Sequence, residues 1–208
     1  EHSVLCGAQI ATTRIVSPLG TVAIAANSLA VTAESLCYMP GYGIAAAATT
    51  LVGQSLGAGR RDLARSFARL TVLLGMVLMS CTGILMFLLA PQMFALLTPV
   101  EEVRALGVHV LRIEAFAEPL FAASIVAAGA LRGAGDSVAP SVLNLVSMWG
   151  VRITASILLA PRLGLTGVWV AMCGELCFRG ILFLVRLFRG KWLDRTLIRP
   201  EPKEMEVT

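Results

Sequence analysis

The stretch LTVLLGMVLMSCTGILMFLLA, residues 70–90, contains no charged side chain. It is long enough for one helix to cross a bilayer, which takes about 20 residues. Similar apolar runs, separated by short loops that carry arginine, recur along most of the chain. In hydrocarbon, each backbone polar group must be satisfied within its own segment, so such runs predict helices. The sequence therefore predicts an all-α, polytopic membrane helix bundle.

The composition supports a bilayer as the surrounding medium. Of the 208 residues, 57% are hydrophobic and 14% are charged, whereas a soluble domain carries about 25% charged residues. The net charge of +4 does not indicate a nucleic-acid partner, because the arginines lie mostly at expected helix ends and not in a patch with aromatic residues. The five cysteines fall mostly inside apolar segments and predict neither a disulfide framework nor a metal site.

We expect five complete membrane-spanning helices and one partial helix, in one bundle over residues 1–190, followed by a polar cytoplasmic tail over 191–208. Prolines are expected to shape these helices, with Pro91 and Pro161 ending two of them and Pro40 disturbing another. The expected ranges are 2–16 for the partial helix, and 22–51, 70–90, 103–131, 138–159 and 163–187 for the complete ones.

Basic residues predict the orientation, because cytoplasmic loops are enriched in lysine and arginine. Loops rich in these residues alternate with loops poor in them, as an odd number of complete spans requires. We expect a multi-pass protein of the plasma (inner) membrane with a cytoplasmic C-terminus. The residues expected on the cytoplasmic side are Arg60, Arg61, Arg65, Arg69, Arg132, Arg186, Arg189, Lys191, Arg195 and Arg199.

Two glycine-rich motifs stand out at expected cytoplasmic loops. The first is GIAAAATTLVGQSLGAG, residues 43–59, and the second is ALRGAGD, residues 130–136. Both predict tight turns, since glycine permits positive φ and lets helices approach closely. Arg132 and Asp136 are expected to hold the second turn against the membrane surface. The candidate turn residues are Gly53, Gln54, Gly57, Gly59, Arg132, Gly133, Gly135, Asp136 and Pro140.

Together these motifs resemble the loops of the multidrug and toxic compound extrusion (MATE) transporters, over about residues 5–190. The resemblance implies the C-terminal lobe of a two-lobe transporter, with most of the first helix of that lobe absent. It also implies a missing N-terminal lobe, either on the same chain or on a partner. The expected activity is secondary antiport of drugs, xenobiotics or other amphipathic small molecules in exchange for H⁺ or Na⁺, with no other cofactor.

One position departs from the family pattern. Some members carry an acidic cation ligand about eleven residues before the arginine of the second motif, where this chain has Phe121. The resemblance then implies an ion site in the missing N-terminal lobe. Proton coupling there, as in the subgroup related to the DNA-damage-inducible transporters that this chain resembles, is expected in preference to a sodium site at this position.

Glu114 and Glu118 are candidates for ion coupling or substrate attraction. They are spaced as neighbours on one face of the expected helix over 103–131. An ionisable group at membrane depth is costly and is by default a functional hypothesis. Repulsion between two close carboxylates favours the protonated form of one of them, as a proton carrier requires. The alternative is a structural ion pair with Arg112 or Arg152, and Arg152 needs a carboxylate partner in either case.

A second candidate group lies in the expected helix over residues 22–51. Glu34 is its only acidic residue and Asn27 precedes it by two helical turns. Both could face a central cavity, together with Tyr38. In the last expected helix, by contrast, Glu175 and Arg179 are spaced so that they neutralise each other.

Three other functions are weighed against transport of drugs. A flippase for lipid-linked saccharides usually has several basic residues in its cavity, whereas Arg152 is the only deep arginine here without an obvious partner in its own helix. A non-transporting fragment or interaction module is the second. The third is an enzyme, because GQSLG at residues 53–57 matches a nucleophile pattern. That motif follows an expected membrane helix and the chain has only His2 and His109, so no enzyme and no catalytic residue are predicted.

Overall fold

The protein is a bundle of helices. The computed structural model describes residues 2–194, and the side chains of residues 6–193. Within that range every regular element is helical, which confirms the all-α prediction. The α-helices are α1 (His2–Val16), α2 (Thr21–Gly57), α3 (Arg61–Leu97), α4 (Glu101–Glu114), α5 (Glu118–Gly133), α6 (Val138–Leu145), α7 (Thr154–Leu163) and α8 (Leu165–Arg189). The predicted tail lies mostly outside the described residues.

Short helical segments connect or extend these helices. A 3₁₀ turn, η1 (Ser17–Leu19), joins α1 to α2, and another, η3 (Lys191–Asp194), follows α8. Between α6 and α7 the chain adopts a π-helix, η2 (Val146–Ile153), so that α6, η2 and α7 form one continuous helix over Val138–Leu163. Four helices in the described range are long and apolar enough to cross a membrane, namely α2, α3, Val138–Leu163 and α8.

The third of the five expected complete spans, residues 103–131, is wrong as one helix. The structure divides residues 103–131 between α4 and α5, which are separated at Ala115–Ala117. Pro119 accounts for the break, because its ring has no N–H and clashes with the carbonyl group four residues earlier. Shorter turns close the gap, with the amide of Phe116 donating to Ile113 and that of Ala117 donating to Glu114.

Three prolines that lie within expected or observed helices do not end them. Pro40, Pro91 and Pro161 lie inside α2, α3 and α7. The expected ends at Pro91 and Pro161 are therefore wrong, and Pro40 does not break α2. A proline removes one backbone hydrogen bond, but ending a helix in hydrocarbon would leave several backbone groups unsatisfied. Continuing through the proline costs less.

α5 is the central helix of the bundle. It packs against α2, α3 and α8, and every residue from Ala122 to Leu131 is buried. Most of these residues are alanine, glycine or serine, which lets the neighbouring backbones approach closely. By contrast, α3 leaves large apolar side chains exposed along one side, as a lipid-facing surface requires; they include Leu70, Leu73, Leu74, Val77, Leu85 and Leu88.

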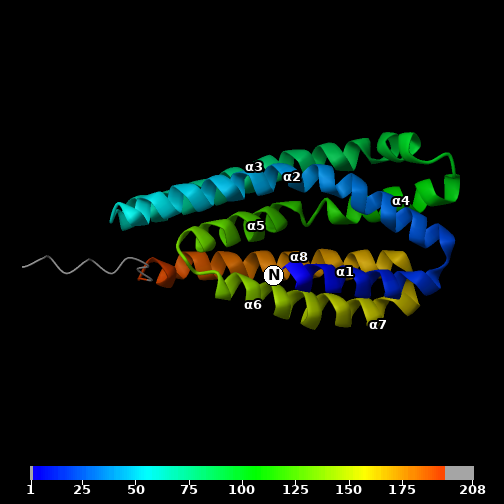
Figure 1. Ribbon diagram of the computed structural model, residues 1–208. Helices are drawn as coiled ribbons and strands as arrows, with labels where there is room; N and C mark the ends of the chain where they lie inside the picture. The colour runs from blue at the N-terminus through cyan, green and yellow to red at the C-terminus, as the bar shows by residue number, and fades with distance from the viewer. Residues whose placement is uncertain (1, 195–208) are drawn as a thin grey trace, which may run out of the picture.

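The basic loops lie at one end of the bundle. Figure 1 shows the α2–α3 turn, the α5–α6 turn and the end of α8 together at the left, while the α3–α4 and α7–α8 connections lie at the right. This alternation agrees with the predicted distribution of loops between the two membrane faces.

Close packing between α8 and α5 leads to a stability prediction. A Cβ atom at Gly180 would overlap the carbonyl group of Leu120, whereas Gly174, on the same helix, has open space around it. We expect Gly180→Ala to lower the free energy of unfolding by about 2 kcal/mol. Gly174→Ala should leave it unchanged or raise it slightly, since alanine is the better helix former. Thermal unfolding of both purified variants in one detergent tests this, and equal transition temperatures would contradict it.

Candidate functional site

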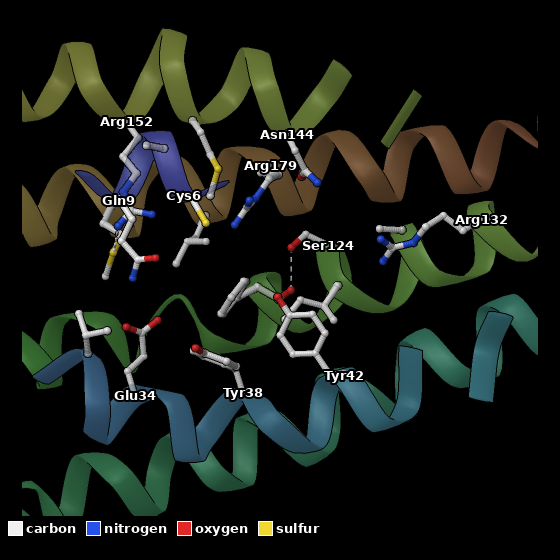
Figure 2. Close-up of a pocket in the computed structure, with 18 residues that line it drawn as sticks. Cys6, Gln9, Glu34, Tyr38, Tyr42, Ser124, Arg132, Asn144, Arg152 and Arg179 are labelled. Carbon is white, nitrogen blue, oxygen red and sulfur yellow. Dashed lines mark hydrogen bonds between the residues drawn. The ribbon is translucent and has the colours of Figure 1, made fainter. Parts of the chain in front are cut away.

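A cavity lies between α2 on one side and the continuous helix Val138–Leu163 with α8 on the other (Figure 2). Its volume is about 510 Å³. Residues far apart in the sequence meet here because α1, α2, α5, α8 and the π-helical segment all contribute to its wall. The polar and aromatic residues of the lining are Gln9, Glu34, Tyr38, Tyr42, Phe121, Ser124, Arg132, Asn144, Arg152 and Arg179. We call this space the central cavity.

α2 contributes an acidic and aromatic face to the central cavity. Glu34, Tyr38 and Tyr42 are each four residues apart and line the same wall. The ring of Tyr38 makes edge contacts with Tyr42 and Phe121, with centroids 5.7 Å apart in each case. Glu34 is 7% exposed. Glu34 and Tyr38 therefore both line this cavity, and their role in binding a substrate or an ion stays a prediction.

Arg152 lies on the opposite wall, within η2. Figure 2 shows its side chain and that of Glu34 extending from facing helices, so their charges act across the cavity. The expected carboxylate partner of Arg152 does not appear among residues 6–193. Instead its Nη2 donates to the sulfur of Met172 at 2.7 Å, and its Nε is buried without an acceptor. The π-helix changes the direction in which side chains after α6 project from the helix axis. Residue spacing that assumes an α-helix therefore did not predict the contacts of Arg152.

Glu175 and Arg179 form the predicted ion pair within α8. Arg179 Nε lies 3.3 Å from Glu175 Oε1, and both side chains are buried. Ser147 also donates to this carboxylate, at 2.5 Å. The pair does not remove Arg179 from the site, because Arg179 also lines the central cavity and lies over the ring of Phe121 at 5.7 Å. Sequence reasoning missed this role.

Glu114 and Glu118 lie at the break between α4 and α5, not on one helix face. Glu114 is the last residue of α4 and Glu118 the first of α5. Both are 0% exposed, and their four carboxylate oxygens accept no hydrogen bond from residues 6–193. Neither lines the central cavity. The charges of Glu34 and Glu118 nevertheless act on Glu114, so the three carboxylates form one electrostatic group.

The arginine partners proposed for these carboxylates make other contacts. Arg112 donates from Nε to the carbonyl of Phe87 at 3.3 Å and lies 5.1 Å from the centre of its ring. Gly83 of α3 provides space for the break, since a Cβ atom there would lie 3.1 Å from the Cβ and Cγ atoms of Glu118. The ion-pair alternative for Glu114 and Glu118 is therefore not seen in the described part of the chain.

Asn27 lies outside the central cavity. Its Oδ1 accepts a hydrogen bond of 3.0 Å from Nε1 of the buried Trp169. It lines a smaller cavity of about 280 Å³, which also reaches Arg152 and Met172. Asn27 thus joins α2 to α8 next to the site rather than within it.

The two glycine motifs lie against each other. A Cβ atom at Gly53 of α2 would be 3.2 Å from the carbonyl oxygen of Gly133, at the end of α5. Thr49 donates to the carbonyl of Gly129 at 2.8 Å. In the turns themselves Gly59 and Gly135 have φ of 72° and 80°, so only these two need the left-handed conformation. Gln54 and Gly57 lie inside α2, because this helix ends at Gly57, six residues beyond its expected end at residue 51.

Comparison with known proteins identifies the family. The MatE family model matches residues 3–158. The chain belongs to the MatE family. This confirms the resemblance predicted from the two motifs. Members of this family are transporters and not enzymes. The DNA-damage-inducible subgroup stays a prediction.

Curated relatives of this MatE chain are named as multidrug resistance proteins. It is 32% identical over 201 residues to the multidrug resistance protein NorM of Aliivibrio fischeri, covering 93% of this chain and 43% of that protein. It is 28% identical over 184 residues to the probable multidrug resistance protein NorM of Thermotoga maritima, covering 88% and 40%. The chain thus spans about two fifths of the length of these relatives.

Solved structures share the fold of the MatE chain. An outward-facing multidrug resistance MATE transporter of the MOP superfamily superposes with a TM-score of 0.86 at 21% identity, over 94% of this chain and 44% of that one. A MOP superfamily transporter from Pyrococcus furiosus, described as having a binding pocket of reverse polarity, gives 0.84 at 20% identity, over 90% and 42%.

Proposed function

We propose that this chain is one lobe of a secondary antiporter that exports drugs or other amphipathic organic compounds in exchange for H⁺ or Na⁺. The observation that carries the proposal is the central cavity, which combines an aromatic and acidic wall on α2 with arginines on the facing helices. Such mixed walls suit amphipathic compounds, because apolar rings provide contact area and a few polar groups orient the ligand. The multidrug resistance names of the relatives support the same reading.

A second lobe completes the transporter in this proposal. Parallel repeats around an axis along the membrane normal form the substrate site near the midplane of many transporters. The second lobe lies either on the same polypeptide or on a partner, and the two lobes rock against each other around the site. The native protein lies in the inner membrane with the C-terminus of α8 in the cytoplasm.

The proposed coupling ion is H⁺. A proton needs only one carboxylate as its binding site. Glu34, Glu114 and Glu118 supply such groups in one electrostatic cluster. Substrate bound next to Glu34 would change the binding free energy of a proton on the cluster, and the bound proton would change that of the substrate, as antiport requires.

Replacing Glu34 tests the substrate role of the cavity. We expect Glu34→Gln to reduce ethidium efflux about fivefold, because a cation loses one opposite charge in a partly desolvated site. Efflux is measured in cells that lack their own exporters, with membrane abundance measured in parallel. Glu102→Gln, an exposed carboxylate at the start of α4, is the matched control. Wild-type ethidium efflux by Glu34→Gln would contradict a role for this wall.

A further inference from the structure

Arg152 has a cationic group whose contacts in the protein are poor. A guanidinium offers five N–H donors in a fixed fork and prefers carboxylate or phosphate oxygens. Here Nη2 meets a thioether sulfur, which is a weak acceptor, and the buried Nε has no acceptor among residues 6–193. Leaving such donors desolvated costs free energy. Arg152 also lines the central cavity, so its charge borders that space.

Arg179 provides a second cationic group, held rigidly. Its ion pair with Glu175 and its position over Phe121 fix the guanidinium. Ser147, from the same π-helical segment as Arg152, donates to Glu175. This contact ties the two segments that carry the arginines to each other. Figure 2 shows Arg152 and Arg179 directed into the central cavity from that side.

The charge balance of the central cavity is unusual for a site that attracts cations. Among the described residues that line it, three are arginines and one is an acid, Glu34, on the far wall. Glu175, buried behind the lining, offsets the charge of Arg179. An anionic group near Arg152 would be attracted by the charge of that guanidinium, which has no carboxylate partner among residues 6–193. A purely cationic compound placed there would be repelled.

We propose that the central cavity recognises compounds through an anionic group, a carboxylate, sulfonate or phosphate, bound by Arg152 with Arg179 beside it. The proposal rests on the proposed transport function and specifies its substrate class: the transported compounds include organic anions and not only organic cations. The apolar part of such a compound packs on Tyr38 and Phe121, and Glu34 remains available for a positively charged substituent.

Binding of two dyes of opposite charge tests this. The complete native polypeptide is purified in detergent, and fluorescence polarisation is measured with fluorescein as the organic anion and ethidium as the organic cation. We expect the wild-type protein to bind fluorescein, and Arg152→Met to weaken that binding about tenfold, the value of one lost charged hydrogen bond. Ethidium binding should not weaken in Arg152→Met, because a cation loses a repulsive neighbour.

Two further variants make the result decisive. Arg162→Met removes an exposed arginine near the end of α7 and should bind fluorescein as the wild type does. Arg152→Lys keeps the positive charge but lacks the planar guanidinium, which can donate two parallel hydrogen bonds to one anion. It should therefore bind fluorescein more weakly than the wild type and more tightly than Arg152→Met. If Arg152→Met fails to fold, as judged by its thermal unfolding, the comparison of Arg152→Lys with the wild type decides.

The outcomes separate this inference from the proposed function. If ethidium binds but fluorescein does not, or if fluorescein binds equally to the wild type and the Arg152 variants, the anion site is wrong while the proposed transport function stands. If neither dye binds and neither is exported from cells, the proposed function fails and the anion site fails with it.

Discussion

Glu118→Gln is expected to abolish proton-driven efflux of ethidium while leaving the amount of protein in the membrane unchanged. Glu118 begins α5 and is fully buried, and its carboxylate accepts no hydrogen bond from the described residues. A carboxylate in such a setting can exchange a proton between two conformations, whereas an amide cannot. Glutamine fills nearly the same volume beside Gly83, so packing is preserved.

The measurement compares transport with and without a proton gradient in reconstituted vesicles. Glu118→Gln should lose accumulation against a concentration gradient but retain ethidium binding, because Glu118 does not line the central cavity. Glu101→Gln, an exposed carboxylate on α4, controls for a loss of surface charge. Full uphill export by Glu118→Gln would remove this residue from the mechanism.

The break between α4 and α5 gives this carboxylate its proposed role. A continuous helix would have presented Glu114 and Glu118 on one face, close to each other. The break instead makes one the end of α4 and the other the start of α5, and discontinuous helices often surround ion sites in transporters. Protonation would then change the interaction between two helical segments, and a ligand shifts such an equilibrium only by its differential affinity for the two states.

The helical fold could be predicted because few backbone conformations satisfy all their hydrogen bonds in hydrocarbon. Residues 70–90 had to form a helix, and α3 extends well beyond them on both sides. The turns that end the two glycine motifs could be predicted, because Gly59 and Gly135 have positive φ. The motif residues Gly53, Gln54, Gly57, Gly133 and Pro140 were wrong as turn residues, since they lie inside α2, α5 and α6. Helix ends could not be predicted from prolines alone, because Pro91 lies inside a membrane helix whereas Pro119 breaks one. Which outcome occurs depends on the neighbouring helices, which a local pattern does not contain.

The site could be predicted only in part, because it depends on contacts between distant segments. Glu34 and Tyr38 were found from polarity at membrane depth. Arg152 was found too, but its neighbour Met172 depends on a π-helix that no spacing rule indicated. The spacing of Glu175 and Arg179 correctly predicted an ion pair within α8. It gave no indication that Arg179 also lines the central cavity.

Arg186→Met is expected to lower the free energy of unfolding by about 3 kcal/mol. Asp136, which ends the second glycine motif, is 0% exposed and forms an ion pair with Arg186 of α8. Removing the arginine leaves a buried negative charge without this partner, and that is more costly than removing both charges. The contact joins the α5–α6 turn to α8, so its loss should also loosen that end of the bundle.

A double-mutant cycle tests the origin of this loss. Asp136→Asn alone should be less damaging than Arg186→Met, because Arg186 is partly exposed and can be hydrated. The double variant should be more stable than Arg186→Met alone, since the buried charge is gone. Arg189→Met, at an exposed position one turn further along α8, is the control and should change little. If Arg186→Met unfolds at the same temperature as Arg189→Met, this ion pair does not hold the turn.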